Sequence, residues 1–395
     1  MDLKKLSEIY KNKISEDEKY YSEYACRDKS ARRLHKDLHQ SVRSEFARDR
    51  DRILYSGAYR RYQGKTQVFS FTNLIDEEMT NRSLHTTYVS QISRTIGKFL
   101  GLNLELIEAI ALGHDLGHTP FGHDGEQALN TCCLAHGLGY FHHNIQSLRI
   151  VDSISRKGRG LNLTFQVRDG IISHDGEVHN TVLKPDLDKT EADIEDYIQK
   201  KKKGEKVEWM PATMEGCVVR ISDTIAYIGQ DIEDAIRLNI LKREELPQDV
   251  VSHLGERNSK IIDTLVKSVI VNSLGKGHIA FDEETSQQLL KLKVFNYAKI
   301  YTNIKVKKSK EVINRSMKLL FEEYLEDIRK DNRESNIFKH FINHKTEGYC
   351  GLYNAEEKVR DFLSTMTDRY FNEEVKRYFL PASKYRYIGA KDGNV

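Results

Sequence analysis

The sequence predicts an all-α fold, in which a helical bundle carries an appended C-terminal helical region. Only 5 prolines interrupt the 395 residues, and long stretches are rich in Leu, Ile, Glu and Lys, most of which favour helices. Along these stretches, apolar residues recur at steps of three and four, as they do on the buried face of a helix. Both observations favour helices over strands.

The composition is typical of a globular protein without a general affinity for polyanions. Hydrophobic residues make up 39% and charged residues 31%, as in ordinary globular chains. With 62 basic and 59 acidic residues, the net charge is only +3, so nucleic-acid binding would need a local patch. We find neither a membrane span nor a signal peptide. The five cysteines include no Cys-x-x-Cys pair, so we expect reduced thiols in a cytoplasmic protein.

We expect three parts along the chain. Residues 1–40 are charged and rich in tyrosine, which predicts one or two surface helices. Residues 41–245 show strong apolar periodicity and hold every candidate functional residue. Residues 246–395 are predicted to form further helices, such as 259–273 and 312–329. No repeat or low-complexity linker separates them from the core, so we expect them to pack on it.

Two predicted helices bring histidine and aspartate to one apolar surface. The first covers about residues 81–100 and places His85 on its apolar face. The second starts after Asn103, which is a suitable N-cap. Its inner face leads to Asp115, with His114 beside it.

A third predicted helix runs from about Met214 to Arg237. Asp223 lies on its apolar face, and Tyr227 and Asp231 follow on the same face at steps of four. Three inward-facing elements therefore carry ionisable side chains.

His85, His114, Asp115 and Asp223 together favour a metal site over separate structural roles. A lone histidine on an apolar face is more often a core residue, and Asp223 alone could pair with Arg220. However, buried carboxylates are costly unless they are paired or bound to a metal. Two nitrogens and two carboxylates suit Mn²⁺, Fe²⁺, Co²⁺, Zn²⁺ or, less obviously, Mg²⁺.

Residues 111–126 form the densest cluster of acid–base groups in the chain. Three histidines, two aspartates and one glutamate stand among glycines and a proline. The small residues allow tight turns that bring these groups to one point.

The order of these residues resembles the H…HD…D signature of the HD superfamily of metal-dependent phosphohydrolases. An isolated His-Asp pair is weak evidence: His174-Asp175 is another, and we interpret it as structural because no histidine helix stands at matching spacing. Longer sequence motifs within about residues 40–240 resemble those of the deoxyguanosine triphosphate triphosphohydrolase family. They are Arg-Asp-Arg-Asp-Arg-Ile at 48–53, Tyr-Arg-Arg at 59–61, Lys-Thr-Gln-Val-Phe at 65–69, the whole run of residues 114–126, Asn-x-Gln-Ser-Leu-Arg at 144–149, Leu-Asn-Leu-Thr at 161–164 and Asp-x-x-Ala-Tyr at 223–227.

The resemblance implies hydrolysis of dNTPs, either dGTP or several of them, at the α-phosphorus. The products are a deoxynucleoside and inorganic triphosphate, and a divalent metal ion (Mn, Mg, Fe, Co or Zn) at the four residues above activates water. His123 matches the family's general acid, which protonates the leaving 5′ oxygen. Glu126 matches the carboxylate that orients it.

Six further residues are expected to contact the substrate, five of them because they match residues that do so in the family. Gln67 matches a contact to the sugar 3′ hydroxyl, and the ring of Tyr227 would exclude a ribose 2′ hydroxyl. Thr224 stands where a vertebrate relative has lysine, so the triphosphate contacts differ from that relative. The five matches are Gln67, Arg82, His118, Tyr227 and Asp231, and His143 is expected to supply part of the charge of the missing lysine.

The family also implies homo-oligomers, an activating dNTP at a second site and weak binding of single-stranded DNA. Two alternatives stay open. The first is another HD phosphohydrolase, acting on nucleoside monophosphates or cyclic phosphodiesters. The second is a nucleotide- or nucleic-acid-binding regulator with a vestigial site.

Two basic features have a structural and a functional interpretation. The arginines of residues 48–52 either form ion pairs within one helix or border the active site or a subunit interface. His35 and His39, at helical spacing, are interpreted as a surface pair rather than a metal site.

Overall fold

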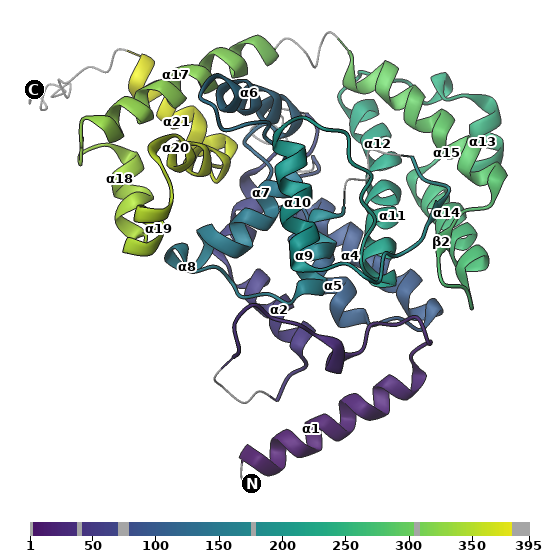
Figure 1. Cartoon of the computed structure of the whole chain (residues 1–395). Coiled ribbons are helices and arrows are strands. Elements are labelled where there is room, and N and C mark those ends of the chain that lie inside the picture. Colours follow the sequence, from purple (N-terminus) through teal and green to yellow (C-terminus); the bar gives the residue numbers. More distant parts are fainter. Residues whose placement is uncertain (1–2, 38–41, 70–78, 175–178, 304–308, 381–395) are drawn as a thin grey trace, which may run out of the picture.

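The computed structural model describes residues 3–37, 42–69, 79–174, 179–303 and 309–380, and helices dominate it, as the sequence predicts. The strands of the described residues are β1 (Val182–Leu183) and β2 (Ile279–Ala280), which pair antiparallel. This short pair joins the middle of the chain to its C-terminal part (Figure 1).

The remaining elements are short and medium helices. The N-terminal and central ones are α1 (Leu3–Asp17), η1 (Glu18–Tyr20), η2 (Asp28–Ser30), α2 (Glu45–Leu54), α3 (Gly57–Arg60), η3 (Arg61–Gly64), α4 (Arg82–Leu100), α5 (Leu104–Gly113), α6 (Gly122–Ala135), α7 (His143–Arg149), η5 (Ile150–Ile154), α8 (Ser155–Gly158), α9 (Phe165–Ile172), α10 (Glu191–Lys202), α11 (Met214–Ile228) and α12 (Gln230–Arg237). The later ones are η6 (Arg243–Glu245), α13 (Gln248–Leu254), α14 (Asn258–Ser273), α15 (Glu283–Asn296), η7 (Tyr297–Tyr301), α17 (Lys310–Arg329), α18 (Asn336–His340), η8 (Ile342–His344), α19 (Glu347–Leu352), α20 (Ala355–Ser364) and α21 (Asp368–Phe379).

Helices α4, α5 and α11 pack against one another and form the centre of the molecule. Asn81 caps α4 by accepting a hydrogen bond from the Leu84 amide, and Gly101 ends it in the left-handed region, at φ 66°. Asn103 caps α5. These three predicted helix ends are confirmed.

The prediction of one continuous helix from about Met214 to Arg237 is wrong. The structure divides it into α11 and α12 at Gly229. A Cβ atom at Gly229 would lie 2.4 Å from Oδ1 of Asn258 on α14, so a larger residue here would displace the Asn258 side chain.

The chain after residue 245 lies in two groups that flank the centre. Figure 1 shows α13, α14 and α15 on one side and α17 to α21 on the other. One continuous cluster of buried apolar side chains extends from Phe46 of α2 to Phe371 of α21. The domain boundaries that we expect at residues 40 and 245 stay a prediction.

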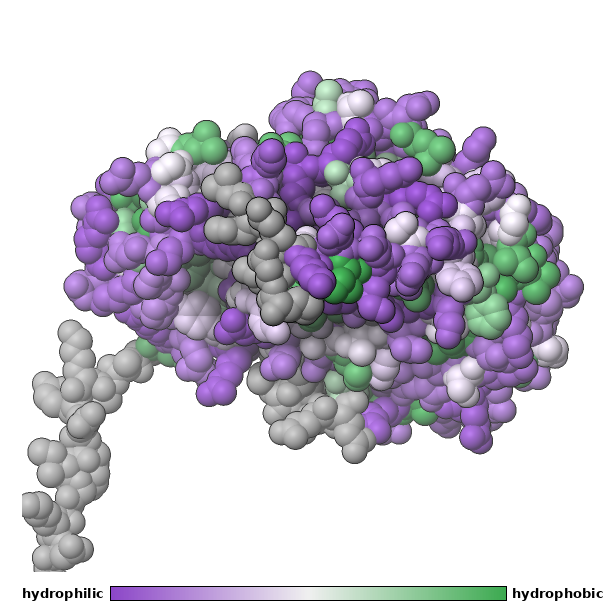
Figure 2. Space-filling view, turned by 90° about the horizontal axis from the view of Figure 1, so that it is seen from below, coloured by the Kyte–Doolittle hydropathy of each residue, from purple (hydrophilic) through white to green (hydrophobic). Residues whose placement is uncertain are grey.

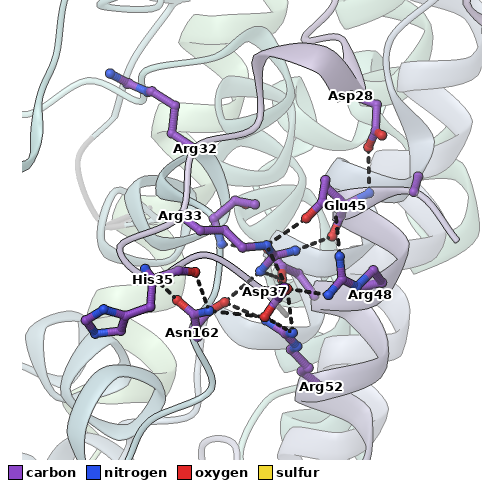
Figure 3. A network of polar contacts seen from close by, with 12 residues as sticks. Asp28, Arg32, Arg33, His35, Asp37, Glu45, Arg48, Arg52 and Asn162 are labelled. Carbon is purple, nitrogen blue, oxygen red and sulfur yellow. Dashed lines mark hydrogen bonds and ion pairs between the residues drawn. The ribbon is translucent and has the colours of Figure 1, made fainter. Parts of the chain in front are cut away.

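The basic α2 is held mainly by residues that precede it. Arg48 has a partner within the helix in Glu45, and both Arg48 and Arg52 bind Asp37 (Figure 3). Arg33 binds the buried Asp49. Arg50 pairs with Asp51 and Arg52 lies 4.0 Å from Asp49, so the expected ion pairs within one helix are present, and the preceding segment adds further partners. The network fastens the N-terminal segment to the core.

The surface is largely hydrophilic. Figure 2 shows hydrophobic residues only as small separate groups on the face that it presents. In the described part of the chain, we find no helix with the length and apolar character needed to cross a membrane. His35 is exposed, and His39 lies outside the described residues.

Candidate active site

Four side chains predicted to bind metal converge between α4, the end of α5 and α11. His85 Nε2 lies 2.9 Å from Asp223 Oδ1. His114 Nε2 lies 3.5 Å from Asp115 Oδ2 and 3.8 Å from Asp223 Oδ1. All four are buried. His85, His114 and Asp115 each offer one ligand atom within 4.8 Å of the others.

The hydrogen bonding of His114 fits a metal ligand. Its Nδ1 lies 2.7 Å from the Ala111 carbonyl oxygen, which can only accept, so Nδ1 carries the proton and Nε2 carries the lone pair. This Nε2 is buried and has no hydrogen-bond partner among the described residues. Leaving such an atom unpaired costs free energy, and a divalent cation would use its lone pair.

The two carboxylates are held in their ionised form, as metal ligands must be. Burial alone would raise the pKa of Asp115, but His114, His118 and Arg82 hold it well below its usual range. Arg82 NH1 lies 2.5 Å from Asp115 Oδ2. Burial likewise opposes ionisation of Asp223, but a hydrogen bond from His85 and the nearby His114 imidazole lower its pKa.

A second cluster surrounds Glu126 on α6. The His143 side chain places Nδ1 3.0 Å from both Glu126 oxygens, and its backbone amide donates to Glu126 at 2.7 Å. His123 Nδ1 lies 3.5 Å from Glu126 Oε2. His118 stacks on His143 with ring centroids 4.0 Å apart, and its Nε2 lies 3.2 Å from Asp115 Oδ1. The two clusters are therefore contiguous.

His174, which the sequence analysis interprets as structural, lies in contact with this assembly. Like His114, it directs Nδ1 to the carbonyl three residues earlier, Ile171, at 2.6 Å. Its Nε2 lies 3.1 Å from His143 Nε2 and 3.6 Å from Asp115 Oδ1. Burial, with His114 and His143 nearby, lowers its pKa to about 4, which keeps the ring neutral. Position 175 lies outside the described residues.

The residues predicted to contact the sugar are less closely grouped than those of the two clusters described above. The side-chain oxygen of Gln67 is buried without a hydrogen-bond partner among the described residues. The backbone carbonyl oxygen of Gln67 lies 3.5 Å from Arg82 NH2. Tyr227 is half-buried on α11. Asp231 is buried, and the Tyr301 hydroxyl donates to it at 2.5 Å. Burial raises the pKa of Asp231 to about 7.

Lys65 and Asp368, neither of which is a predicted site residue, attach the C-terminal helices to the site. Lys65 donates to the carbonyl oxygens of His118 and Ser364. Asp368, at the start of α21, accepts from the amides of Thr66 and Phe121, each at 3.0 Å. These contacts hold the segment before Gln67 and the turn after His118 in place.

The helical bundle and its buried histidine–aspartate centre define an HD-domain protein. Residues 82–200 match the HD domain, and residues 279–377 match the phosphohydrolase-associated domain. The chain belongs to the deoxyguanosinetriphosphate triphosphohydrolase-like family of HD phosphohydrolases.

Three relatives show the extent of this similarity, and each is named deoxyguanosinetriphosphate triphosphohydrolase-like protein. The one from Caldanaerobacter subterraneus is 38% identical over 92% of this chain and 94% of its own length. The one from Desulfatibacillum aliphaticivorans is 35% identical over 92% of this chain and 95% of its own length. The one from Clostridium tetani is 36% identical over 86% of each chain.

Proposed function

We propose that this chain hydrolyses dNTPs, dGTP or several of them, to a deoxynucleoside and inorganic triphosphate. The observation that carries the proposal is the contact between the two clusters. A centre that fits a divalent ion adjoins a histidine–glutamate group suited to proton transfer. The names of the relatives support this substrate class.

His85, His114, Asp115 and Asp223 would hold Mn²⁺, Fe²⁺, Co²⁺, Zn²⁺ or Mg²⁺. When bound, the ion supplies positive charge for the α-phosphate and lowers the pKa of a water molecule. Arg82 positions Asp115 through their ion pair.

His123 would protonate the leaving 5′ oxygen, because an alkoxide is a poor leaving group. Its side chain is 55% exposed, so it can meet a substrate that enters from solvent. Glu126 lies on the Nδ1 side of this ring, which leaves Nε2 to deliver the proton. His118, His143 and Arg82 would contact the phosphates.

Gln67, Tyr227 and Asp231 would contact the sugar. An amide at Gln67 can both donate to and accept from a 3′ hydroxyl. Its buried side-chain oxygen without a partner is available for such a bond. Homo-oligomerisation, an activating dNTP, weak binding of single-stranded DNA and a cytoplasmic location stay predictions from the family resemblance.

Product analysis tests the proposal. The protein is incubated with each dNTP, singly and mixed, with Mg²⁺ or Mn²⁺, and the products are separated by chromatography. We expect deoxynucleoside and triphosphate in equal amounts. Release of orthophosphate or pyrophosphate, or cleavage only of monophosphates or cyclic phosphodiesters, would support the other HD phosphohydrolases. Nucleotide binding without turnover under any metal would support a vestigial regulator.

A further inference from the structure

Two imidazoles outside the four proposed ligands face each other next to the metal centre. The Nε2 atoms of His143 and His174 lie 3.1 Å apart. The Nδ1 atom of His174 lies against the Ile171 carbonyl oxygen, which can only accept, so Nδ1 carries the proton and Nε2 the lone pair. The Nδ1 atom of His143 lies 3.0 Å from both oxygens of the Glu126 carboxylate, and the same argument places a proton on it.

This arrangement needs a positive charge between the two rings. Because Nδ1 of each ring donates, a neutral His143 points its Nε2 lone pair at the lone pair of His174, and the two repel. Either a second proton on His143 or a metal ion that accepts both lone pairs removes this repulsion. A proton shared by two rings needs no third partner, whereas a metal ion does.

Asp115 supplies such a third partner. One of its oxygens lies within 4.8 Å of the ligand atoms of His143 and His174, which themselves lie within that distance of each other. Asp115 Oδ1 is 3.6 Å from His174 Nε2, whereas Oδ2 faces the first centre, 3.5 Å from His114 Nε2. Oδ1 also lies 3.2 Å from His118 Nε2, and a carboxylate oxygen has a second lone pair for that contact. The carboxylate can therefore serve one ion through each oxygen.

The separation of the two nitrogens fits a single metal ion. Nitrogens bound at about 2.0–2.1 Å from one ion, with angles of about 90–109° between the bonds, lie about 2.9–3.4 Å apart. The 3.1 Å between the Nε2 atoms of His143 and His174 falls within this range. Two imidazoles and a carboxylate suit Mn²⁺, Fe²⁺, Co²⁺ or Zn²⁺.

Packing holds the two histidines in this position. Asn144 donates Nδ2 to the Ile172 carbonyl at 2.9 Å, which ties the start of α7 to the end of α9. A Cβ atom at Gly117 would lie 2.2 Å from the carbonyl oxygen of His143, so the turn after Asp115 approaches α7 as closely as only glycine permits. The three ligands thus stand together on packed backbone before any ion binds.

We propose that Asp115, His143 and His174 bind a second divalent transition-metal ion, so that Asp115 bridges a two-metal centre. Two adjacent ions stabilise both the attacking and the leaving oxygen when a phosphate ester is cleaved. In this arrangement His143 reaches the phosphates through the ion rather than through a direct hydrogen bond. The proposal rests on the first centre, with which it shares Asp115, but not on the identity of the substrate.

The metal content of the full chain, measured without nucleotide, tests the second site. The protein is stripped with EDTA, reloaded with Mn²⁺, desalted and analysed by mass spectrometry of the metal. We expect two ions per chain, but one in each of the variants His174→Leu and His143→Ala. Even a lost outer-shell partner weakens metal binding by about 10–100-fold, so a lost ligand should weaken the second ion by at least about 100-fold. The matched control, His136→Gln, changes a histidine that pairs with Glu322 at the far end of α6 and should keep both ions.

Electron paramagnetic resonance distinguishes a bridged pair from two separate ions. Two Mn²⁺ ions that share Asp115 should give a spin-coupled signal, and His174→Leu should convert it to the signal of a single ion. Circular dichroism and thermal melting show whether each variant is folded. His143 is less buried than His174, so His143→Ala still tests the site where His174→Leu does not fold.

Each result supports or overturns the second site. Two coupled ions in the wild type and one in a folded variant support it. One ion in the wild type overturns the second site alone and leaves a proton on His143 as the bridge between the rings. Two uncoupled ions, or a second ion that survives both substitutions, mean an adventitious ion only and also overturn it. Loss of both ions from folded His174→Leu would mean that His174 supports the first centre instead, and a wild type without any ion would overturn both centres.

Discussion

His123 and His143 share Glu126, but they differ in their exposure. Both side chains have Nδ1 within 3.5 Å of this carboxylate, yet 55% of the His123 side chain is exposed against 15% for His143. Burial opposes the ionisation of Glu126, but the charge of His143 and hydrogen bonds from both histidines hold its pKa well below its usual range. An ionised Glu126 stabilises a protonated imidazole. The more accessible His123 is therefore the better proton donor to a substrate.

We predict that His123→Ala lowers kcat for dNTP by roughly 10²–10⁴-fold, the usual effect of losing a general acid. Metal binding should survive, because His123 lies outside the metal centre. Glu126→Gln should lower kcat less. The control is a p-nitrophenyl phosphate ester, whose leaving group needs no proton, and on which His123→Ala should lose little activity. Equal losses on both substrates would contradict the role of His123 as acid.

The four proposed metal ligands give a second prediction about individual residues. His114→Ala, Asp115→Ala and Asp223→Ala should each abolish turnover, because each removes one proposed ligand. Metal content by mass spectrometry should fall, and the far-ultraviolet circular dichroism should stay helical. A variant that keeps both near-wild-type rates and full metal occupancy would show that the assignment of ligands is wrong.

Individual helices could be predicted from the sequence where the residues that begin and end them act on neighbouring residues. The caps Asn81, Gly101 and Asn103 act within one turn of their own helix, so their spacing in the sequence is sufficient. Asp368, in contrast, meets Thr66 across 302 residues. No local pattern encodes such a contact. His174 carried a usable signal, its His-Asp pair, but only packing showed that it faces His143.

Glu215 of α11 joins three elements, and this predicts a pH dependence. It is fully buried, and its Oε1 accepts from the amides of Cys26 and Asn103, while Oε2 has no partner among the described residues. Burial raises its pKa from 4.5 to about 7 despite these bonds. The folded state therefore holds a proton that the unfolded state releases. The stability from this group is full below pH 4.5 and is lost as pH rises towards 7.

We predict that Glu215→Gln removes this loss. The variant should gain up to about 3 kcal/mol relative to the wild type between pH 4.5 and 7, from about 1.4 kcal/mol per unit of pKa shift. Urea unfolding at several pH values measures the difference. Glu195→Gln, on the exposed face of α10, is the control and should show no such trend. A constant difference between Glu215→Gln and wild type across this range would contradict the prediction.

At the scale of the whole molecule, α1 extends away from the body (Figure 1). This position suits contact with another copy, as homo-oligomerisation would require. We predict an oligomer by light scattering of the full chain at working concentration. Monomers alone, both with and without dNTPs, would exclude this assembly and any activating site shared between subunits.

The HD-domain helices and the C-terminal helices are joined by a buried ion cluster as well as by their common hydrophobic core. Asp361 of α20 is fully buried and accepts from Arg149 of α7 at 2.8 Å. Gln146 and Tyr349 also donate to it, and Arg360 lies beside it. Burial would raise the pKa of Asp361, but Arg360 and Arg149 outweigh it and lower this pKa to about 2. The cluster thus depends on an ionised carboxylate.

We predict that Asp361→Asn destabilises the protein by about 3–5 kcal/mol at neutral pH, since it leaves the buried Arg360 and the half-buried Arg149 with only the more distant Glu357 as counter-charge. The sign of the pH effect follows from the lowered pKa. The stability from Asp361 is full above its ordinary value of 3.8 and is lost as pH falls through about 2. The difference between wild type and variant should therefore shrink by about 2 kcal/mol from pH 5 to pH 2, at about 1.4 kcal/mol per unit. Urea unfolding at stepped pH measures it, with the exposed Asp188→Asn as control. A difference that stays constant down to pH 2 would mean that shape and hydrogen bonding, rather than charge, join the two parts of the molecule here.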